Sequence, residues 1–383
     1  MSEKIKLLFR HRSMEMGGVE KVMLSILNNL DKEKFEMTVC LNINQGELRD
    51  EFPDHVRKVS LTHGREDFSG NSIIRKIQLI RRRLKLKRIQ KNPAIADQIL
   101  GEVYDVEIGM TYGDFAAVLH STNKKSKKIG WFHSEINLPK LQPLVPGILK
   151  HFPEFDQMVY CSQNIRDMMH QYYPDLAYPP EAVIINAIPV EEIKRKAEEQ
   201  MGEFPSGPVF ISIGRLHSRK GYHKLIEAHT RLIREGIHHS VVVIGDGEEL
   251  HNLTAQITAH KVEGTFILAG NKMNPYPYVK HADYFILPSE SEAWPLVIAE
   301  ALLLQKPIIA TRTGDIPEMV KDGITGCLIN YDPDEMYESM KSFLTDPELT
   351  EQIRENLEDI EEQFDNRKIF NDIEKMILNL VKK

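Results

Sequence analysis

The sequence predicts an α/β protein with two Rossmann-like domains, each built on a parallel sheet. Short apolar runs alternate with longer segments of helical periodicity along most of the 383 residues. The alternation is interrupted between residues 179 and 208 by Pro and Gly, and then starts again. A hydrophobic content of 42% is enough to fill two cores, and the length suits two domains of roughly 150 residues or more.

The first half opens with a strand-helix-strand unit. Residues 5–9 form an apolar strand, a loop with Gly17 and Gly18 follows, residues 19–30 have helical spacing, and residues 36–43 form a second strand. Further strands are expected at residues 103–108, 128–132, 158–161 and 182–185, and a helix is expected at residues 163–172. These elements predict an N-terminal domain over residues 1–188.

The second half repeats the pattern and ends in helices. Strands are expected at residues 209–213, 240–244, 265–269, 284–287, 308–310 and 327–329, and helices at residues 222–235 and 248–260. Three final helices, at residues 334–343, 348–364 and 367–382, have no strands between them. The second domain is expected to span residues 189–366.

Composition narrows the class of protein. No apolar run approaches the ~20 residues that span a bilayer, and the first residues lead straight into a strand, without the pattern of a secretion signal. Cys40, Cys161 and Cys327 are far apart, and each lies in or beside an apolar stretch. That spacing is typical of reduced core thiols rather than of a disulfide or zinc framework. We therefore expect a cytoplasmic protein.

Charge is distributed unevenly. Residues 1–190 hold 27 of the 49 Lys and Arg and 23 of the 56 Asp and Glu, so the first half is basic and the rest acidic. Much of the excess lies in residues 73–91, in which Ile73, Ile77, Ile80 and Leu84 share one helical face. This pattern predicts a basic amphipathic helix that contacts an anionic membrane surface, which would make the protein peripheral to the inner face of a membrane. A solvated surface helix is the alternative, and nucleic acid is disfavoured because no stacking aromatic residues are interleaved.

Two carboxylates indicate a ligand site in the second domain. Glu292 follows the strand at residues 283–288, and Glu300 lies inside a helix whose first turn suits Pro295. Both are expected at the carboxyl edge of a parallel sheet, where open α/β sheets bind ligands. The alternative is that Glu292 is favoured only by the helix dipole and that Glu300 is a solvated surface residue.

Two cations precede a helix in the same domain. Arg215 and Lys220 lie between the strand at residues 209–213 and the following helix. Arg215 supplies a forked donor and Lys220 a point charge, next to the helix amides, which favours a diphosphate ligand over an ordinary exposed loop. In the first domain, Gly17 and Gly18 also precede a helix, so their amides can approach an anion, unless they form only a tight turn.

Other patterns exclude several kinds of chemistry. The loop Gly245-Asp246-Gly247 lacks the third glycine of a dinucleotide fingerprint, which disfavours an NAD enzyme. The segment Asp332-Pro333-Asp334 is better interpreted as a turn and helix cap than as a metal site. No His/Cys cluster has zinc spacing and no nucleophile elbow is present, so neither a metal nor a cofactor is expected. His133, at a strand end, is expected to face the second domain, although isolated histidines are usually structural.

The ordered set of motifs carries a family resemblance. Gly17-Gly18-Val19-Glu20, Trp131-Phe132-His133, Gly214-Arg215-Leu216 with Lys220-Gly221, Gly245-Asp246-Gly247, and Glu292 with Glu300 resemble the retaining glycosyltransferase family 4, of GT-B fold. Residues 274–278 and 314–320 are similar to those of its bacterial surface-polysaccharide members. The resemblance covers almost the whole chain.

The resemblance implies a GT-B arrangement, in which two Rossmann-like domains face each other across a cleft and residues 367–383 cross back to the first domain. It implies that Arg215 and Lys220 hold the donor diphosphate, Glu300 the ribose and Glu292 the transferred sugar. The rest of the implied donor site is Gly17, Gly18, Asn271 at the base, Ala293, Trp294, Pro295 and Leu296. His133 would touch the sugar or the reaction centre, so the catalytic set is His133, Glu292, Arg215 and Lys220.

Two positions depart from the family pattern. Ala293 stands where a Gly commonly follows the first motif glutamate, and Gln305 stands where a loop glycine is common. Both substitutions leave the charged residues intact but bear on the backbone geometry around the sugar.

These inferences predict a metal-independent, retaining glycosyltransferase of polysaccharide biosynthesis. It would move a sugar from a nucleotide-sugar, with UDP favoured by family frequency, to a glycan or polyprenyl-linked acceptor. Internal return is preferred to double displacement because no residue is an obvious covalent nucleophile. The alternatives are a nucleotide-sugar epimerase or phosphorylase of the same fold, or a non-catalytic sugar-nucleotide-binding protein.

Overall fold

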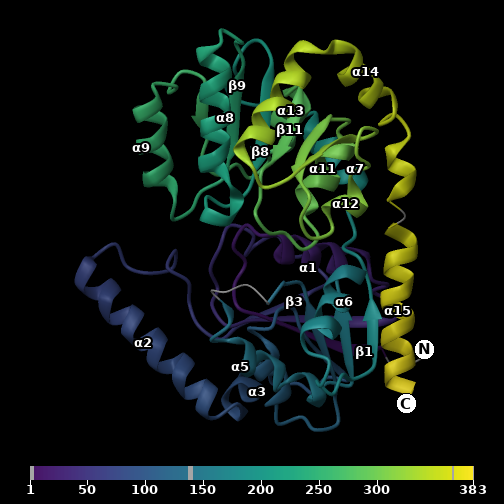
Figure 1. The fold of residues 1–383 in the computed structure, drawn as a ribbon. Helices are drawn as coiled ribbons and strands as arrows, with labels where there is room; N and C mark the ends of the chain where they lie inside the picture. Colours follow the sequence, from purple (N-terminus) through teal and green to yellow (C-terminus); the bar gives the residue numbers. More distant parts are fainter. Residues whose placement is uncertain (1–3, 137–140, 365, 383) are drawn as a thin grey trace. The chain divides into compact units, whose positions relative to one another are not determined.

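The computed structural model describes residues 4–136, 141–364 and 366–382, and the chain divides into two compact units. Unit 1 comprises Met1–Ala187 together with Asn366–Lys383, and unit 2 comprises Ile188–Asp365 (Figure 1). Each unit contains one sheet whose neighbouring strands are all parallel. The predicted fold class, α/β with two Rossmann-like domains, is confirmed.

The sheet of unit 1 has the order β3-β2-β1-β4-β5-β6-β7. Its strands are β1 (Ile5–His11), β2 (Phe35–Leu41), β3 (Arg57–Ser60), β4 (Val106–Gly109), β5 (Lys127–Phe132), β6 (Gln157–Tyr160) and β7 (Glu181–Val183). Its helices are α1 (Gly18–Asn29), α2 (Ser72–Lys91), α3 (Ala94–Leu100), α4 (Phe115–Leu119), α5 (Val145–Leu149), α6 (Gln163–Tyr172) and α15 (Asn366–Lys382), with a 3-10 turn at Phe152–Glu154. Most of the central strands are buried, which is why they read as apolar runs.

The helix α15 belongs to unit 1 although it ends the chain. Its residues Ile373, Ile377 and Leu380 are buried at helical spacing. On the same helix, Glu374 accepts hydrogen bonds from the Asp31 N–H at 2.9 Å and from Lys34 Nζ at 2.8 Å. Apolar packing and this ion pair therefore attach α15 to the loop between α1 and β2.

The sheet of unit 2 has the order β10-β9-β8-β11-β12-β13. Its strands are β8 (Val209–Ile213), β9 (Ser240–Ile244), β10 (Phe266–Leu268), β11 (Tyr284–Leu287), β12 (Ile308–Thr311) and β13 (Gly326–Ile329). Its helices are α7 (Val190–Ala197), α8 (Tyr222–Arg234), α9 (Leu250–His260), α10 (Tyr276–His281), α11 (Leu296–Leu303), α12 (Ile316–Met319), α13 (Pro333–Thr345) and α14 (Pro347–Glu355), with 3-10 turns at Ser218–Lys220 and Ile360–Gln363.

One predicted helix is wrong. Residues 348–364 were expected to form a single helix, but α14 ends at Glu355 and a separate 3-10 turn follows. The side chain of Asn356, which caps α14, donates to the carbonyl of Ile324 at 3.1 Å. Leu357 and Ile360 are both buried after the break. Tertiary packing therefore turns the chain where local periodicity would have continued the helix.

The helix α2 has two different faces. Asn71 caps it by accepting hydrogen bonds from the N–H groups of Ile73 and Ile74. Ile89 is buried on the inner face, and Arg82 there donates to Gln45 at 3.2 Å. The outer face presents a stripe of apolar side chains that are 45–68% exposed: Ile73, Ile77, Ile80 and Leu84. Figure 1 shows α2 standing away from the sheet of unit 1. Within the described residues, no helix has both the length and the hydropathy needed to cross a bilayer.

Candidate functional site

An ion pair lies at the carboxyl end of the unit 2 sheet. Lys220 follows β8 and Glu292 follows the neighbouring strand β11, so parallel pairing brings the two loops together. Lys220 Nζ donates to Glu292 Oε1 at 2.6 Å, and Ser289 Oγ donates to the same oxygen at 2.6 Å. The side chains of Lys220 and Glu292 are 22% and 12% exposed. The structure thus joins one predicted cation and one predicted carboxylate.

Two glycines allow these loops to pack closely. Gly221, which precedes α8, has φ of +70°, and a Cβ there would lie 1.9 Å from the carbonyl oxygen of Pro288. Gly314 has φ of +55°, and a Cβ there would lie 1.8 Å from the carbonyl oxygen of Glu292. No other residue could occupy either position without moving the backbone. The position of Glu292 therefore depends on glycines from two other loops.

Glu300 is a buried residue of α11. It is 3% exposed, and its Oε1 accepts a hydrogen bond from the Tyr276 hydroxyl of α10 at 3.1 Å. Burial, followed by the charge of Glu300, raises the pKa of Tyr276, so Tyr276 remains a donor. The interpretation of Glu300 as a solvated surface residue is wrong. A charged group buried among apolar helix residues indicates a role other than solubility.

Arg215 is placed differently from Lys220. Its side chain is 73% exposed, and its Nε lies 3.4 Å from Glu248 Oε2. The loop that carries it is held by backbone hydrogen bonds, from Gly214 to Ile244 and from Leu216 to Asp246, both at 3.0 Å. A fixed backbone with an exposed guanidinium leaves Arg215 accessible to an anion, but the structure does not bring it to Glu292.

The remaining predicted donor residues of unit 2 lie in two loops. In the loop before α11, Ala293 O accepts from the N–H of Asp315 at 3.0 Å, Pro295 is the residue that caps the helix, and Leu296 is its first residue. The indole N–H of Trp294 is buried and has no hydrogen-bond partner among the residues that the structure describes. In the other loop, Asn271 is exposed after β10.

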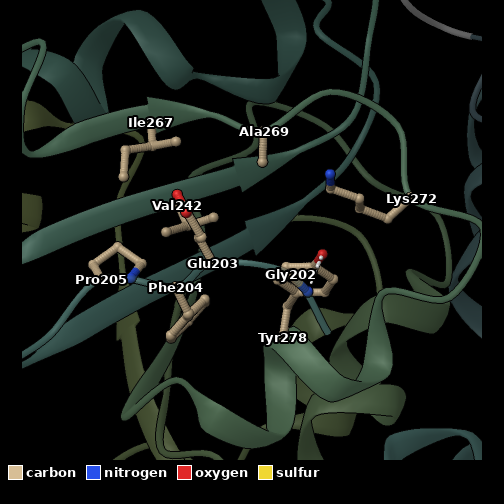
Figure 2. Close-up of a pocket in the computed structure, with 9 residues that line it drawn as sticks. All are labelled: Gly202, Glu203, Phe204, Pro205, Val242, Ile267, Ala269, Lys272 and Tyr278. Atoms are coloured by element: carbon tan, nitrogen blue, oxygen red, sulfur yellow. Dashed lines mark hydrogen bonds between the residues drawn. The ribbon is translucent and has the colours of Figure 1, made fainter. Parts of the chain in front are cut away.

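A pocket of about 340 Å³ adjoins the loop of Asn271. Figure 2 shows its apolar floor on the strands and the aromatic and charged side chains around it. The residues that line it are Gly202, Glu203, Phe204, Pro205, Val242, Ile267, Ala269, Lys272 and Tyr278. Lys272 Nζ lies 5.6 Å from the centroid of the Tyr278 ring, whose hydroxyl accepts from the Gly202 N–H at 3.2 Å.

The unit 1 residues of the predicted site follow two strands, β1 and β5, that are separated by β4 in the sheet. Gly17 and Gly18 follow β1 and begin α1, and His133 follows β5. The imidazole of His133 stacks on Trp131, with centroids 6.2 Å apart and planes 3° apart. Its Nε2 atom is buried, without a partner within the described chain. Burial, and secondly the charge of His11, lowers the pKa of His133 to about 3. His133 is therefore neutral at physiological pH.

Several residues of these sites were not singled out in the sequence. Ser289 and Tyr276 gain their roles only through folding, because their partners lie on other elements. In unit 1, His11 lies between Glu20 and Asp114. A polar residue at the end of an apolar strand is the one signal that could have identified His11. Across the described ranges, no group of three or more His, Cys, Asp or Glu is arranged to hold a metal ion.

Comparison with known families identifies part of the chain. Residues 193–359, which cover most of unit 2, match the family model described as Glycosyl transferases group 1. This range contains both the Lys220–Glu292 pair and Glu300.

Two curated relatives and one solved structure extend the likeness. The N-acetylgalactosamine-N,N'-diacetylbacillosaminyl-diphospho-undecaprenol 4-alpha-N-acetylgalactosaminyltransferase of Campylobacter jejuni is 23% identical over 384 residues, covering 96% of this chain and 97% of the relative. The uncharacterized glycosyltransferase MJ1059 of Methanocaldococcus jannaschii is 26% identical over 173 residues, so this chain spans only 42% of that relative. The crystal structure of Anabaena Alr3699/HepE in complex with UDP and glucose has a TM-score of 0.77 at 21% identity, covering 97% of this chain and 99% of that one.

Proposed function

We propose that this chain, which has the GT-B fold, is a group 1 glycosyltransferase that transfers a sugar from a UDP-sugar to a glycan or lipid-linked acceptor, with retention of configuration. The observation that carries the proposal is the group formed by Lys220, Glu292 and Ser289, one loop away from the buried Glu300. A cation and two carboxylates at the carboxyl end of a parallel sheet suit a sugar diphosphate with ribose hydroxyls.

In the proposed reaction, the bond between the anomeric carbon and the leaving phosphate oxygen breaks while negative charge builds on the diphosphate. Lys220 and Arg215 stabilise that charge without a metal ion. The acceptor hydroxyl attacks on the same face, and its proton passes to the departing phosphate oxygen. Glu292 holds the sugar, Glu300 the ribose, and Asn271 lies near the base. In unit 1, Gly17 and Gly18 approach the phosphate, and the neutral His133 accepts a hydrogen bond from the sugar.

The state of Lys220 supports this assignment. In the structure, its ammonium is neutralised by Glu292. A bound diphosphate would compete for the same cation, and Glu292 would then be available to a sugar hydroxyl. One substrate would thus satisfy both partners of the pair. UDP is favoured as the nucleotide because the related HepE structure was solved with UDP.

The acceptor side of the proposal rests on α2 and on one relative. The Campylobacter relative is named for a diphospho-undecaprenol substrate, which is a polyprenyl lipid. In α2, the exposed stripe of Ile73, Ile77, Ile80 and Leu84 is flanked by basic residues. That arrangement suits the interface of an anionic membrane, where a lipid-linked acceptor would be found. We therefore place the enzyme in the cytoplasm, peripheral to the inner membrane face.

A release assay tests the function. Purified protein is incubated with UDP-, GDP- or ADP-sugars, with and without lipid-linked or glycan acceptors, in the presence of EDTA. Acceptor-dependent release of UDP that EDTA does not abolish is the expected result, and early-time proton NMR of the product should show the anomeric configuration of the donor. Conversion of one UDP-sugar into another without release would instead indicate an epimerase. Phosphate-dependent formation of a sugar 1-phosphate would indicate a phosphorylase.

A further inference from the structure

A histidine clamp lies at the carboxyl end of the unit 1 sheet. His11 is the last residue of β1, Glu20 lies in the first turn of α1, and Asp114 lies in the loop after β4. His11 Nε2 is 3.0 Å from Glu20 Oε1, and His11 Nδ1 is 3.2 Å from Asp114 Oδ2. His11 and Asp114 are 4% and 1% exposed, so the cluster is buried.

The geometry requires a charged imidazole. An ionised carboxylate can only accept hydrogen bonds, so both ring nitrogens of His11 must donate. Asp114 Oδ2 also accepts from the N–H of Thr111 at 3.1 Å and from the Thr111 hydroxyl at 2.7 Å. This oxygen therefore acts as an acceptor, and His11 Nδ1 must be the donor of the bond between them. Burial opposes the charge, but the hydrogen bonds and charges of Asp114 and Glu20 outweigh it and raise the pKa of His11 to about 10.

The clamp reaches the glycine loop. A Cβ at position 17 would lie 2.4 Å from Glu20 Oε2. Gly17 has an extended backbone, with φ of −142°, so the close approach rather than the backbone angle requires glycine here. Any side chain at this position would push the Glu20 carboxylate away from His11. The glycine loop and the His11 clamp are therefore one packed unit.

The charge of His11 also acts on His133. It is the second cause, after burial, of the low pKa of that residue. Among the described residues, Glu20 on α1 and Asp114 after β4 are the titratable groups hydrogen-bonded to His11, and the charge of His11 also contributes to the low pKa of His133 after β5. Because an imidazolium repels a second positive charge, His11 favours the neutral form of His133.

We propose that His11 is a positioning residue for sugar transfer: through Glu20 and Asp114 it ties the Gly17–Gly18 loop to the loop after β4, and β4 is the neighbour of the strand β5 that His133 follows. The role of His133 toward the sugar rests on the proposed function. The clamp itself does not, because it is a property of unit 1 without substrate.

The test uses His11→Gln, which removes the charge but retains a polar side chain. His170→Gln is the matched control, because His170 Nε2 also lies 2.9 Å from a carboxylate, that of Glu181, but on the exposed surface of unit 1. The imidazole of His133 is titrated by NMR, with His133→Gln for assignment. We expect the pKa of His133 to rise in His11→Gln and to stay unchanged in His170→Gln.

Kinetics provide the second readout. We expect His11→Gln to lower kcat by about tenfold or more with a smaller rise in KM for the nucleotide-sugar, because the proposed cations of the donor site lie in unit 2 and the loop of Gly17 and Gly18 is loosened rather than removed. Glu20→Gln and Gly17→Ala weaken the clamp more mildly and should shift both readouts in the same direction if His11→Gln does not fold.

Two results would overturn the proposal. One is an unchanged titration of His133 in every folded clamp variant, and the other is a rise in KM without a fall in kcat. If the parent protein transfers no sugar, the proposed function fails, but the His133 titration still decides whether His11 controls its protonation.

Discussion

Lys220 Nζ lies 2.6 Å from Glu292 Oε1, although 72 residues separate the two in the chain. The pair joins the loop before α8 to the loop before α11, and both side chains are mostly buried. Removing either partner alone leaves a charge in a partly buried place without its counter-ion, which is costly. The pair therefore contributes to both stability and the proposed chemistry, and the two contributions can be separated.

Replacing Lys220 with Met should lower turnover by about 10²- to 10³-fold, because the leaving diphosphate loses a donor as its charge develops. The free energy of unfolding should also fall, by about 1–3 kcal/mol, because Glu292 loses its charged partner. Steady-state kinetics and urea unfolding measure the two effects. The double variant Lys220→Met, Glu292→Gln should regain stability but not turnover. Normal turnover in Lys220→Met would remove the assignment to the diphosphate.

Arg215→Ala should affect turnover alone. Its guanidinium is exposed and pairs with the surface carboxylate of Glu248, so its loss should leave the unfolding transition within about 0.5 kcal/mol of the parent. Turnover should still fall by orders of magnitude if the side chain reaches the departing phosphate. Glu248→Gln serves as the control, since it removes the same ion pair but keeps the cation. Equal kinetics in both variants would contradict the prediction.

Glu300→Gln should weaken nucleotide binding by about 10- to 100-fold, the usual range for a lost hydrogen bond to a charged group. The change keeps an oxygen that can accept from Tyr276, so the packing of α10 on α11 is preserved. Calorimetry with UDP and with a 2′,3′-dideoxy analogue tests the ribose contact directly. The parent should discriminate between the two ligands and Glu300→Gln should not. Equal discrimination by both proteins would move Glu300 out of the ribose site.

The long apolar segments were the predictable part of the fold. Three buried strands, β8, β9 and β11, and the amphipathic helix α6 have the predicted bounds. The strand β3 was missed because its sequence, Arg57–Ser60, is charged and lies at the sheet edge. Short helices such as α7 and α10 were missed because they contain too few turns to show a period. Sequence periodicity thus identifies buried elements better than edges and single turns.

The sequence singled out the charged residues of the candidate site one at a time, but not the pairs that they form. Lys220 and Glu292 stand between a strand end and a helix start, and Glu300 stands inside the helix that follows Glu292, which are local signals. Their partners depend on which strands are neighbours, and a single sequence does not supply that order. Gln305 stands where a loop glycine is common in the family that the sequence resembles. Its φ is +55°, a conformation that a glycine adopts without strain and that costs energy for glutamine.

The buried pair His229 and His239 should make unit 2 sensitive to acid. His239 Nδ1 donates to the Ile237 carbonyl at 2.9 Å, so its Nε2 accepts from His229 Nδ1 at 2.8 Å, and both rings are neutral. Burial, and then the charge of His239, lowers the pKa of His229 to about 3, and burial also lowers the pKa of His239. A proton on His239 Nε2 would break the bond between the rings, and a proton on His229 Nε2 would place an uncompensated charge in a buried site.

The sign of the pH effect follows from these pKa values. Between pH 6.5 and 3 the unfolded chain binds protons that the folded His229 excludes, so this stability is present above pH 6.5 and is lost as the pH falls. Each excluded proton contributes about 1.4 kcal/mol per pH unit. Urea unfolding at pH 7.5 and 5.0 should therefore show a smaller pH dependence in His229→Gln than in the parent. Identical dependence in both proteins would contradict the assignment. His11 acts in the opposite direction. Its pKa is raised to about 10 in the folded protein, so the stability that its charge contributes is lost as the pH rises toward 10.

The helix α2 supplies the last prediction, and its two faces determine the variant. Arg82 is left unchanged because it donates to Gln45 and lies 5.2 Å from the centroid of the Phe68 ring, on the face of α2 that packs on the rest of unit 1. The substituted residues are all exposed and are changed to Gln: Arg81, Arg83, Lys85, Lys87 and Arg88. The control variant changes exposed Lys124 and Lys125 to Gln on another loop of the same unit.

The variant in α2 should bind anionic vesicles far more weakly than the parent, since each basic residue near such a surface contributes about 1 kcal/mol. Added salt should reproduce the loss, because charges at a surface are screened within about 10 Å at 0.1 M. A second variant with Ile77→Ser and Leu84→Ser should weaken binding without changing its salt dependence, since the apolar stripe contributes burial rather than charge. Affinity for UDP should be unaltered in all of them, which separates membrane contact from the donor site. Co-sedimentation that is equal for parent, control and both α2 variants would reduce α2 to an ordinary solvated helix and withdraw the membrane-bound acceptor.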